Sequence, residues 1–309
     1  MSIVIICPNR DNRDWVAALH SIDPALNVEV WPEIRAPEAV EFAVSWDQPP
    51  HVFNQFPNLK CISSIGAGVE HLLNDNTVPV GIPLVRLVDD DLKQSMAEYV
   101  MLGVLEHFRR FSDYRLQQEQ AKWEELQIPH ISQLGIGIMG FGEIGGYVAK
   151  KLSDFGFKVF GWNRGRKRTD HMQVHSGLDE LGKFLKNSNI LVCLLPLTDK
   201  TEDILNAQTF SQLPPGAYLI NAGRGGHLVD DDLLSALDSG QLSGALLDVF
   251  TEEPLPEQHP FWLNGKITVT PHTASVTNPE SASAQIVENY RRVLGNEPLL
   301  NLVDINSGY

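Results

Sequence analysis

The sequence has few cysteines and few cations, and it has no long apolar run. Its three cysteines stand far apart without a C-x-x-C pair, which is typical of a protein in a reducing compartment. Apolar stretches such as residues 190–195 are much shorter than the roughly 18 residues that a membrane helix needs. The apolar start, residues 2–7, follows no positively charged leader. We therefore expect a cytoplasmic protein without a membrane span.

Positive charge is scarce along the chain. Lysine and arginine number 24 against 39 acidic residues, which gives a formal net charge of -15. Nucleic acids and anionic membranes attract broad positive surfaces, so this composition excludes general affinity for either. Four cations nevertheless crowd into residues 164–168, directly after the apolar run 157–162. In such an acidic chain this cluster indicates a local function.

The remaining composition is that of an ordinary globular protein, with 309 residues of which 43% are hydrophobic. This length predicts two domains. Short β-branched runs alternate with helical patterns, which predicts α/β domains with doubly wound parallel sheets covered on both faces. Strands are expected in residues 2–7, 27–31, 42–46, 59–65, 134–139, 158–162, 189–195, 217–221, 244–249 and 266–270. The segment from Met96 to Gln127 is expected to form one or two long helices.

A glycine loop, Gly140-x-Gly142-x-x-Gly145, lies directly after an apolar run and before an amphipathic pattern. Gly140 would permit a tight turn, Gly142 would let a pyrophosphate approach the backbone, and Gly145 would let helix and strand pack closely. The helix N-terminus would add free N–H groups for the phosphates. A structural glycine turn is the alternative. Because strand, loop, helix and second strand follow in register, the pattern favours dinucleotide binding.

The end of the second strand predicts which dinucleotide binds. An acidic residue that bonds the ribose of NAD is usual about 20 residues after the glycines, but this position holds neutral Asn163, followed by Arg164. An amide can donate to a 2′-phosphate, and a guanidinium can bind it with two hydrogen bonds. Further positive charge comes from Arg166, Lys167 and Arg168. We expect NADP(H). A solvated basic turn would explain the charges but not the missing acid.

Three later strand ends each deliver a polar residue. Arg224 follows residues 217–221, Glu253 follows residues 244–249, and His272 follows residues 266–270. The carboxyl ends of parallel strands meet at one edge of a sheet, so these side chains can converge. Each alone could be a helix-flanking cation, a solvated acid or a buried structural histidine. Their occurrence at three strand ends favours a common site.

These motifs carry a resemblance to a known family. The segments "GIMGFGEIG", "NAGRG", "LDVFTEEPLP" and "TPHTAS" have the order and spacing of the D-isomer-specific 2-hydroxyacid dehydrogenases, which the chain resembles over nearly its full length. It most resembles the glyoxylate/hydroxypyruvate reductase A branch, through "FRRFSDYRLQQ", "WNRGRK" and "VSWDQPP". It departs from many relatives at two positions. Asn163 replaces the usual acidic residue that binds the ribose, and Glu70 stands where many relatives have aspartate. The resemblance implies a Rossmann nucleotide domain, residues 99–282, inserted in a flavodoxin-like substrate domain, residues 1–98 and 283–309.

The resemblance implies a catalytic set of Arg224, Glu253 and His272. An imidazole titrates near neutral pH, so His272 suits the donor of a proton to a substrate carbonyl. A carboxylate on its other nitrogen would favour the imidazolium and orient the ring. Arg224 would hold the substrate carboxylate and polarise the carbonyl.

The remaining expected contacts divide into cofactor and substrate residues. For the cofactor we expect Gly140, Gly142, Glu143, Ile144, Gly145, Asn163, Arg164, Arg166, Lys167, Leu195, Pro196, Ala222, Gly223, Asp248 and Ala274, with Asp248 on the nicotinamide carboxamide by resemblance. For the substrate we expect Trp46, Ala67, Gly68, Val69, Arg224 and His272. The backbone of residues 67–69 could bind a carboxylate or simply start a helix. Trp46 could wall the pocket or be a core residue. No metal is expected, because His171 and His175 lack a third ligand.

The function expected from residues and resemblance together is NADPH-dependent reduction of glyoxylate or hydroxypyruvate to the 2-hydroxy acid. A relative that acts on a bulkier 2-oxo acid or on phosphoglycerate is an alternative, although no regulatory domain follows the last helical pattern. A protein that senses NADP(H) without turnover is another alternative, because a fold alone does not fix function. The aromatic residues of the segment 96–127 predict a homodimer.

Overall fold

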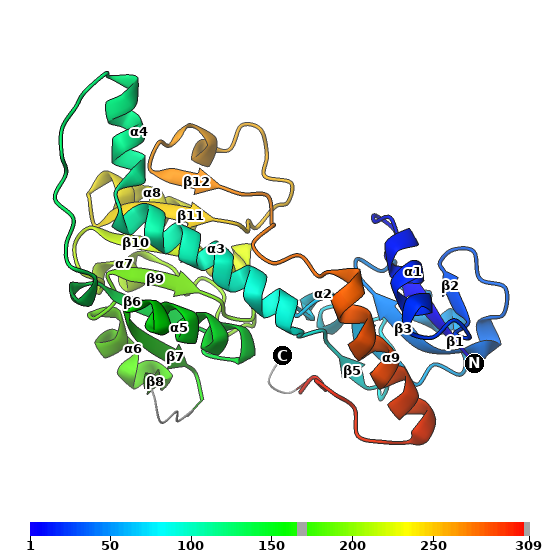
Figure 1. Ribbon diagram of the computed structural model, residues 1–309. Helices are drawn as coiled ribbons and strands as arrows, with labels where there is room; N and C mark the ends of the chain where they lie inside the picture. Colours follow the sequence, from blue (N-terminus) through cyan, green and yellow to red (C-terminus); the bar gives the residue numbers. More distant parts are fainter. Residues whose placement is uncertain (166–171, 306–309) are drawn as a thin grey trace. The chain divides into compact units, whose positions relative to one another are not determined.

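The computed structural model describes residues 1–165 and 172–305 (Figure 1). The chain divides into two compact units. The first unit comprises Met1–Leu92 and Val276–Tyr309, and the second comprises Lys93–Ser275. The domain limits expected from the sequence, after residues 98 and 282, stay a prediction. No helix in the described ranges is long and apolar enough to cross a membrane.

The first unit is built on a parallel sheet with the strand order β2-β1-β3-β4-β5. Its strands are β1 (Ser2–Ile6), β2 (Val28–Val30), β3 (Val40–Ser45), β4 (Cys61–Ser64) and β5 (Leu84–Val85). Its helices are α1 (Arg13–Ile22), α2 (Glu70–Leu73) and α9 (Pro279–Gly295). Successive residues of β1 alternate between two buried clusters. Ile3 and Ile5 pack with α1 and α9, whereas Val4 and Ile6 pack on the other face. Both faces of the sheet are therefore covered.

Local sequence explains where α9 begins. The side chain of Asn278 accepts a hydrogen bond from the backbone N–H of Glu280 at 3.0 Å, which caps the helix. Pro279 stands at the first helical position, where its missing N–H costs nothing. Ile286 and Tyr290, one turn apart, then bury one helical face against the sheet.

The second unit is built on a larger parallel sheet with the strand order β12-β11-β10-β9-β6-β7-β8. Its strands are β6 (Gly135–Met139), β7 (Lys158–Asn163), β8 (Gln173–Ser176), β9 (Ile190–Cys193), β10 (Ala217–Asn221), β11 (Leu242–Leu247) and β12 (Ile267–Val269). The helices are α3 (Asp90–Phe108), whose first residues belong to the first unit, α4 (Phe111–Glu119), α5 (Glu143–Phe155), α6 (Gly177–Leu185), α7 (Ala207–Ser211) and α8 (Asp230–Asp238). The reversal of strand order beside β6 is that of a Rossmann domain, and the first unit has the flavodoxin-like order. The predicted fold class is confirmed.

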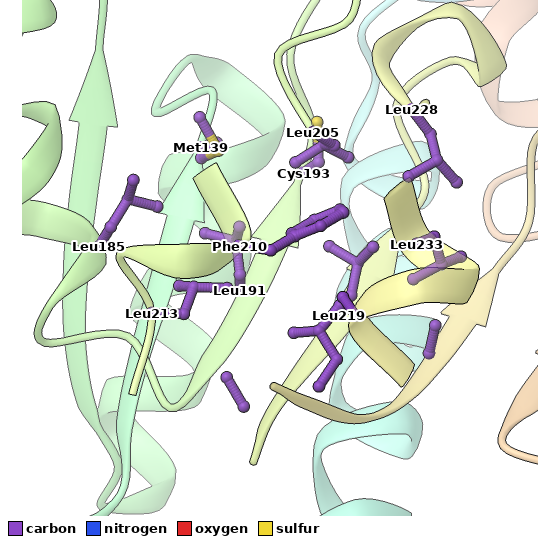
Figure 2. Packing of buried hydrophobic residues seen from close by; sticks show 14 of the residues in the cluster. Met139, Leu185, Leu191, Cys193, Leu205, Phe210, Leu213, Leu219, Leu228 and Leu233 are labelled. Carbon is purple, nitrogen blue, oxygen red and sulfur yellow. The ribbon is translucent and has the colours of Figure 1, made fainter. Parts of the chain in front are cut away.

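Two buried clusters cover the two faces of the larger sheet. Figure 2 shows one of them, in which strand residues such as Leu191 and Leu219 pack against Phe210 of α7 and Leu233 of α8. The other cluster joins the alternate strand residues to α3 and α5. Its strand members include Ile136, Ile138, Val192 and Ile220. Because the central strands β6, β9 and β10 are apolar on both sides, polar side chains can gather at their carboxyl ends.

The long helical segment differs from the expectation in its limits. Helix α3 begins at Asp90 and buries Met96, Val100 and Val104, which are spaced one turn apart. Arg110 is left-handed with φ of 57°, so the helix breaks there and α4 follows. Helical structure ends at Glu119, ahead of the expected limit at residue 127.

Candidate active site

The geometry of the glycine loop agrees with the task that the sequence indicated for each of its three glycines. Gly140 has φ of +96°, and a Cβ there would lie 2.5 Å from the carbonyl oxygen of Leu194. A Cβ at Gly145 would collide with the carbonyl oxygen of Gly140. Gly142 instead faces open space and precedes α5 without a side-chain cap. The loop therefore keeps the N-terminus of α5 accessible to an anion. This arrangement suits the pyrophosphate of a dinucleotide.

Asn163 locks this loop to the end of β7. Its Oδ1 accepts from the N–H of Phe141 at 2.8 Å, and its Nδ2 donates to the carbonyl of Phe141 at 2.9 Å. An aspartate could make only the first of these two bonds, because a carboxylate is an acceptor. Asn163 thus has a structural role in addition to its expected role in the choice of cofactor. Arg164 follows at once and is half-buried.

Three of the expected basic residues cannot be placed. Arg166, Lys167 and Arg168 lie outside the described residues. Two further expected cofactor residues stand in the first turn of α5, where Glu143 is exposed and Ile144 is half-buried.

Asp248, at the end of β11, holds the segment that carries His272. Its buried carboxylate accepts from the hydroxyl of Thr270 at 2.6 Å and from the N–H groups of Thr273 and Ala274, each at 2.8 Å. The N–H of His272 also donates to the carbonyl of Asp248 at 2.8 Å. Because charge-assisted bonds to a buried carboxylate are strong, these contacts fix the path of residues 270–274.

His272 and Glu253 form a pair at this edge of the sheet. Nδ1 of His272 lies 2.7 Å from Oε2 of Glu253, whose Oε1 accepts from the N–H of Phe250 at 2.9 Å. Burial raises the pKa of Glu253, but the bonds from His272 and Phe250 and the positive charges of His272 and Arg224 outweigh it, so the pKa of Glu253 is lowered. A carboxylate can only accept, so Nδ1 donates and Nε2 is the ring nitrogen that can face a ligand.

Arg224 follows β10 and is held through its main chain. Its carbonyl accepts from Nδ2 of Asn221 at 3.2 Å, and its guanidinium Nη1 donates to the carbonyl of Gly223 at 2.7 Å. The guanidinium is also close enough to Glu253 to lower the pKa of that carboxyl. The structure thus brings the three expected catalytic side chains together at the carboxyl ends of β10, β11 and β12.

The other expected cofactor residues line neighbouring strand ends. Leu195 and Ala222 are buried, and the carbonyl of Pro196 accepts from the hydroxyl of Thr201 at 2.7 Å. Gly223 is buried, and its N–H donates to Oδ1 of Asn221 at 3.2 Å. These segments follow β9 and β10, next to the glycine loop after β6.

Sequence reasoning missed three polar residues that hold this site. They are Asn221, His227 and Thr270. Each is adjacent to a recognised motif, and each bonds to the main chain or side chain of a residue that was predicted. A polar residue at the end of a predicted strand is the signal that could have found Asn221 and Thr270.

In the first unit, the loop after β4 presents backbone donors. Within the described ranges, none of the N–H groups of Ala67, Gly68 and Val69 donates to another protein group. The hydroxyl of Ser64 donates to the carbonyl of Gly68 at 2.6 Å, which fixes the turn. Three such donors in succession can bind a carboxylate.

Trp46 follows β3 in the same unit and has a polar environment for a tryptophan. Its ring lies 4.5 Å from the ring of His71, and the guanidinium of Arg10 stands 5.2 Å above it. A Cβ on Gly66, beside the loop of donors, would lie 3.4 Å from the indole. The half-buried Trp46 is thus next to this loop, and it also packs against the buried cluster that contains Ile5 and Val44.

The three cysteines offer no reactive thiol to this site. All three thiols are free and buried, and burial raises the pKa of each to about 12, so they are unreactive. Among the residues that the structure describes, no group of three or more His, Cys, Asp or Glu side chains could hold a metal ion. His175 packs against the ring of Phe184, and His171 lies outside the described residues.

Comparisons with known proteins show which family the chain resembles. The family model of the D-isomer specific 2-hydroxyacid dehydrogenase NAD binding domain matches residues 101–274. The chain is 41% identical over 315 residues to glyoxylate/hydroxypyruvate reductase A of Yersinia enterocolitica, and 41% identical over 314 residues to that of Serratia proteamaculans, with 100% of each chain covered in both cases.

Two solved structures are also similar over the whole chain. A D-isomer specific 2-hydroxyacid dehydrogenase of Xanthobacter autotrophicus, in complex with NADPH and MES, has a TM-score of 0.97 at 37% identity and covers 100% of this chain and 99% of its own. An NADPH-dependent glyoxylate/hydroxypyruvate reductase of Sinorhizobium meliloti, in complex with NADP and sulfate, has a TM-score of 0.94 at 36% identity and covers 100% of both chains. The predicted family and dinucleotide-binding domain are confirmed: the chain belongs to the D-isomer specific 2-hydroxyacid dehydrogenase family.

Proposed function

We propose that this protein is an NADPH-dependent reductase of small 2-oxo acids, converting glyoxylate to glycolate and hydroxypyruvate to glycerate. The observation that carries the proposal is the 2.7 Å contact between His272 and Glu253, beside Arg224 and at the same sheet edge as the glycine loop. A proton donor, a carboxylate-binding cation and a dinucleotide loop are the parts that this reduction needs.

The proposed roles follow from the geometry of the second unit. Bound NADPH would supply a hydride to C2 of the substrate. His272 would donate the proton on Nε2 to the carbonyl oxygen, while Glu253 accepts from Nδ1 and favours the charged ring. The guanidinium of Arg224 would bind the substrate carboxylate and polarise the carbonyl.

We assign the cofactor to the loop after β6 and the strand ends beside it. The backbone of residues 142–145 would bind the pyrophosphate at the N-terminus of α5, with Gly140 providing the turn. Arg164, next to Asn163, would bind the 2′-phosphate. Contacts to the rest of the cofactor would come from Leu195, Pro196, Ala222, Gly223, Asp248 and Ala274. The relatives with bound NADPH or NADP support this choice of cofactor.

In the first unit we propose that the N–H groups of Ala67, Gly68 and Val69 bind a carboxylate of the substrate. Trp46, held by Arg10 and His71, would limit the size of the 2-oxo acid. The names of the relatives support small substrates of this kind.

We also propose that the protein is a cytoplasmic homodimer with no nucleic-acid partner. Three free buried cysteines suit a reducing compartment. Several large apolar side chains of the segment 96–127 are exposed in the single chain, which supports a partner surface there. They are Leu102, Phe111, Leu116 and Trp123.

Turnover with a panel of 2-oxo acids tests the proposal. NADPH oxidation is followed by absorbance with glyoxylate, hydroxypyruvate, pyruvate, phenylpyruvate and phosphohydroxypyruvate. We expect the highest kcat/KM with glyoxylate or hydroxypyruvate. A higher value with a bulkier acid would replace the substrate assignment. NADPH binding without turnover of any acid would show a sensing protein and overturn the enzymatic role.

A further inference from the structure

His227 is a buried histidine that the proposed mechanism does not use. It lies in the turn after Arg224 and its side chain is fully buried. A buried imidazole must satisfy both ring nitrogens, so its partners show which task it performs.

The two ring contacts of His227 fix its tautomer. The N–H of Arg224 donates to Nδ1 at 3.1 Å, so Nδ1 carries no proton. Nε2 lies 3.3 Å from the carbonyl oxygen of Pro196, which can only accept, so Nε2 carries the proton. His227 is therefore neutral in this arrangement and is oriented by Pro196, whose carbonyl also accepts from Thr201.

Through one peptide plane, the bond from the N–H of Arg224 to His227 also influences the guanidinium of Arg224. The N–H of Arg224 and the carbonyl of Gly223 belong to the same trans peptide and point in opposite directions. His227 binds the N–H side, and the guanidinium Nη1 of Arg224 binds the carbonyl side at 2.7 Å. Rotation of this peptide would point the N–H toward the guanidinium and remove its acceptor.

The ring also packs closely against Gly223. A Cβ on this glycine would lie 3.1 Å from both Cε1 and Nδ1 of His227, so the imidazole packs directly on the peptide that it orients. Asn221 holds the other side of the turn through the carbonyl of Arg224. The turn is thus fixed at both ends of Arg224.

We propose that His227 is a positioning residue for Arg224: by accepting the backbone N–H, it fixes the peptide whose carbonyl aims the guanidinium at the substrate carboxylate. This inference rests on the proposed function, in which Arg224 binds the 2-oxo acid. His227 touches neither substrate nor cofactor in this role.

Three variants separate positioning from simple packing. In His227→Asn, the amide oxygen stands on the same carbon as Nδ1 and can still accept from Arg224. In His227→Gln the polar atoms lie one carbon further, and in His227→Leu they are absent. We expect KM for glyoxylate or hydroxypyruvate to rise about tenfold in the Leu and Gln variants, the factor that one ordinary hydrogen bond gives. The Asn variant should have a KM close to that of the wild type. The ring also contacts Pro196 and Gly223, which are proposed cofactor residues, so the dissociation constant of NADPH is measured for each variant and should change less than KM.

The matched control is His107→Leu, which removes a half-buried histidine of the second unit whose ring centroid lies 4.3 Å from that of Tyr218. It should lower the melting temperature without changing KM. Equal KM values in the wild type and the Leu variant, or no rescue by Asn, would overturn the positioning role.

Binding of oxamate, an unreactive mimic of a 2-oxo acid, to the NADPH complex gives a readout that needs no turnover. We expect the same order, with the wild type and the Asn variant tighter than the Gln and Leu variants. If the wild type turns over no 2-oxo acid but the oxamate order holds, the proposed reaction fails and the positioning of Arg224 stands. If the wild type neither turns over nor binds oxamate, both are overturned.

Discussion

Nδ1 of His272 lies 2.7 Å from Oε2 of Glu253, and the backbone of His272 is left-handed with φ of 53°. Non-glycine residues adopt this conformation at a cost, and they keep it where the surroundings hold them in place. Here the N–H of His272 is bonded to the carbonyl of Asp248, whose carboxylate binds the next two N–H groups. The imidazole is therefore fixed both by its backbone and by Glu253.

This relationship predicts how the reaction depends on pH. Reduction needs a proton on His272, so activity is present at low pH and lost as the pH rises. In Glu253→Gln a neutral amide replaces the negatively charged partner of the ring, so the alkaline loss of activity should move to lower pH. The measurement is the reductive kcat/KM profile with glyoxylate. An alkaline limb that stays in place would show that Glu253 does not assist His272.

Two controls accompany that profile. His272→Ala should reduce kcat by about 10²–10⁴-fold at every pH and leave NADPH binding intact, because the ring acts on the substrate. The second control is the melting temperature at acid pH. Because the pKa of Glu253 is lowered in the folded protein, its contribution to stability is present above the ordinary carboxyl pKa and is lost as the pH falls through the lowered value. The Gln variant should lack this pH dependence.

The basic residues after β7 predict the choice between NADPH and NADH. Arg164→Ala should weaken NADPH by about ten- to a hundredfold and leave NADH nearly unchanged, because only NADPH has a 2′-phosphate. Dissociation constants from a fluorescence titration check this. Lys158→Ala, at the opposite end of the same strand, is the matched control and should change neither. Efficient use of NADH by the wild type would contradict the assignment.

The exposed apolar residues of the segment 96–127 predict the oligomeric state. Trp123 is fully exposed in the single chain, and Leu116 of α4 is more than half exposed. We expect a dimer by light scattering at micromolar concentration, and we expect Leu116→Glu to shift it to a monomer. Val80→Glu, at a fully exposed apolar position of the first unit, should not change the mass. A wild-type monomer would exclude this partner surface.

Some features of the fold and the site followed from the sequence because they depend on local constraints. The glycine spacing predicted the loop, since the left-handed turn at Gly140 and the close approach at Gly145 tolerate no side chain. Apolar runs predicted the central strands. The edge strands β5 and β8 were not predicted, because one has two residues and the other is largely polar.

Other features depend on partners that a sequence does not reveal. Asn163 was interpreted only as a missing acid, yet it also bonds both backbone groups of Phe141, a loop residue distant in sequence. His227 follows the arginine motif and has no motif of its own, so only its buried contacts distinguish it from a solvated turn residue. The helix break at Arg110 has no proline or glycine to announce it. In each case tertiary contacts decide the local structure.

Tyr99, Thr270 and Asp248 form a chain of hydrogen bonds. Thr270 donates its single hydroxyl proton to Asp248 at 2.6 Å, so Tyr99, 2.7 Å from the same hydroxyl, must be the donor to Thr270. Burial raises the pKa of Tyr99, which keeps its proton available for this bond.

Removing the middle of this chain should affect both stability and activity. Thr270→Val keeps the shape of the side chain but removes a donor to Asp248 and the acceptor for half-buried Tyr99, which should cost about 1–3 kcal/mol of unfolding free energy. Because Asp248 holds the backbone around His272, kcat should fall as well. Tyr99→Phe removes only the outer donor and leaves the bond from Thr270 to Asp248, so it should lower the melting temperature with little loss of kcat. Urea unfolding and steady-state rates of both variants measure this. Equal kcat losses in the two variants would show that Asp248 does not depend on Thr270 to hold the histidine segment.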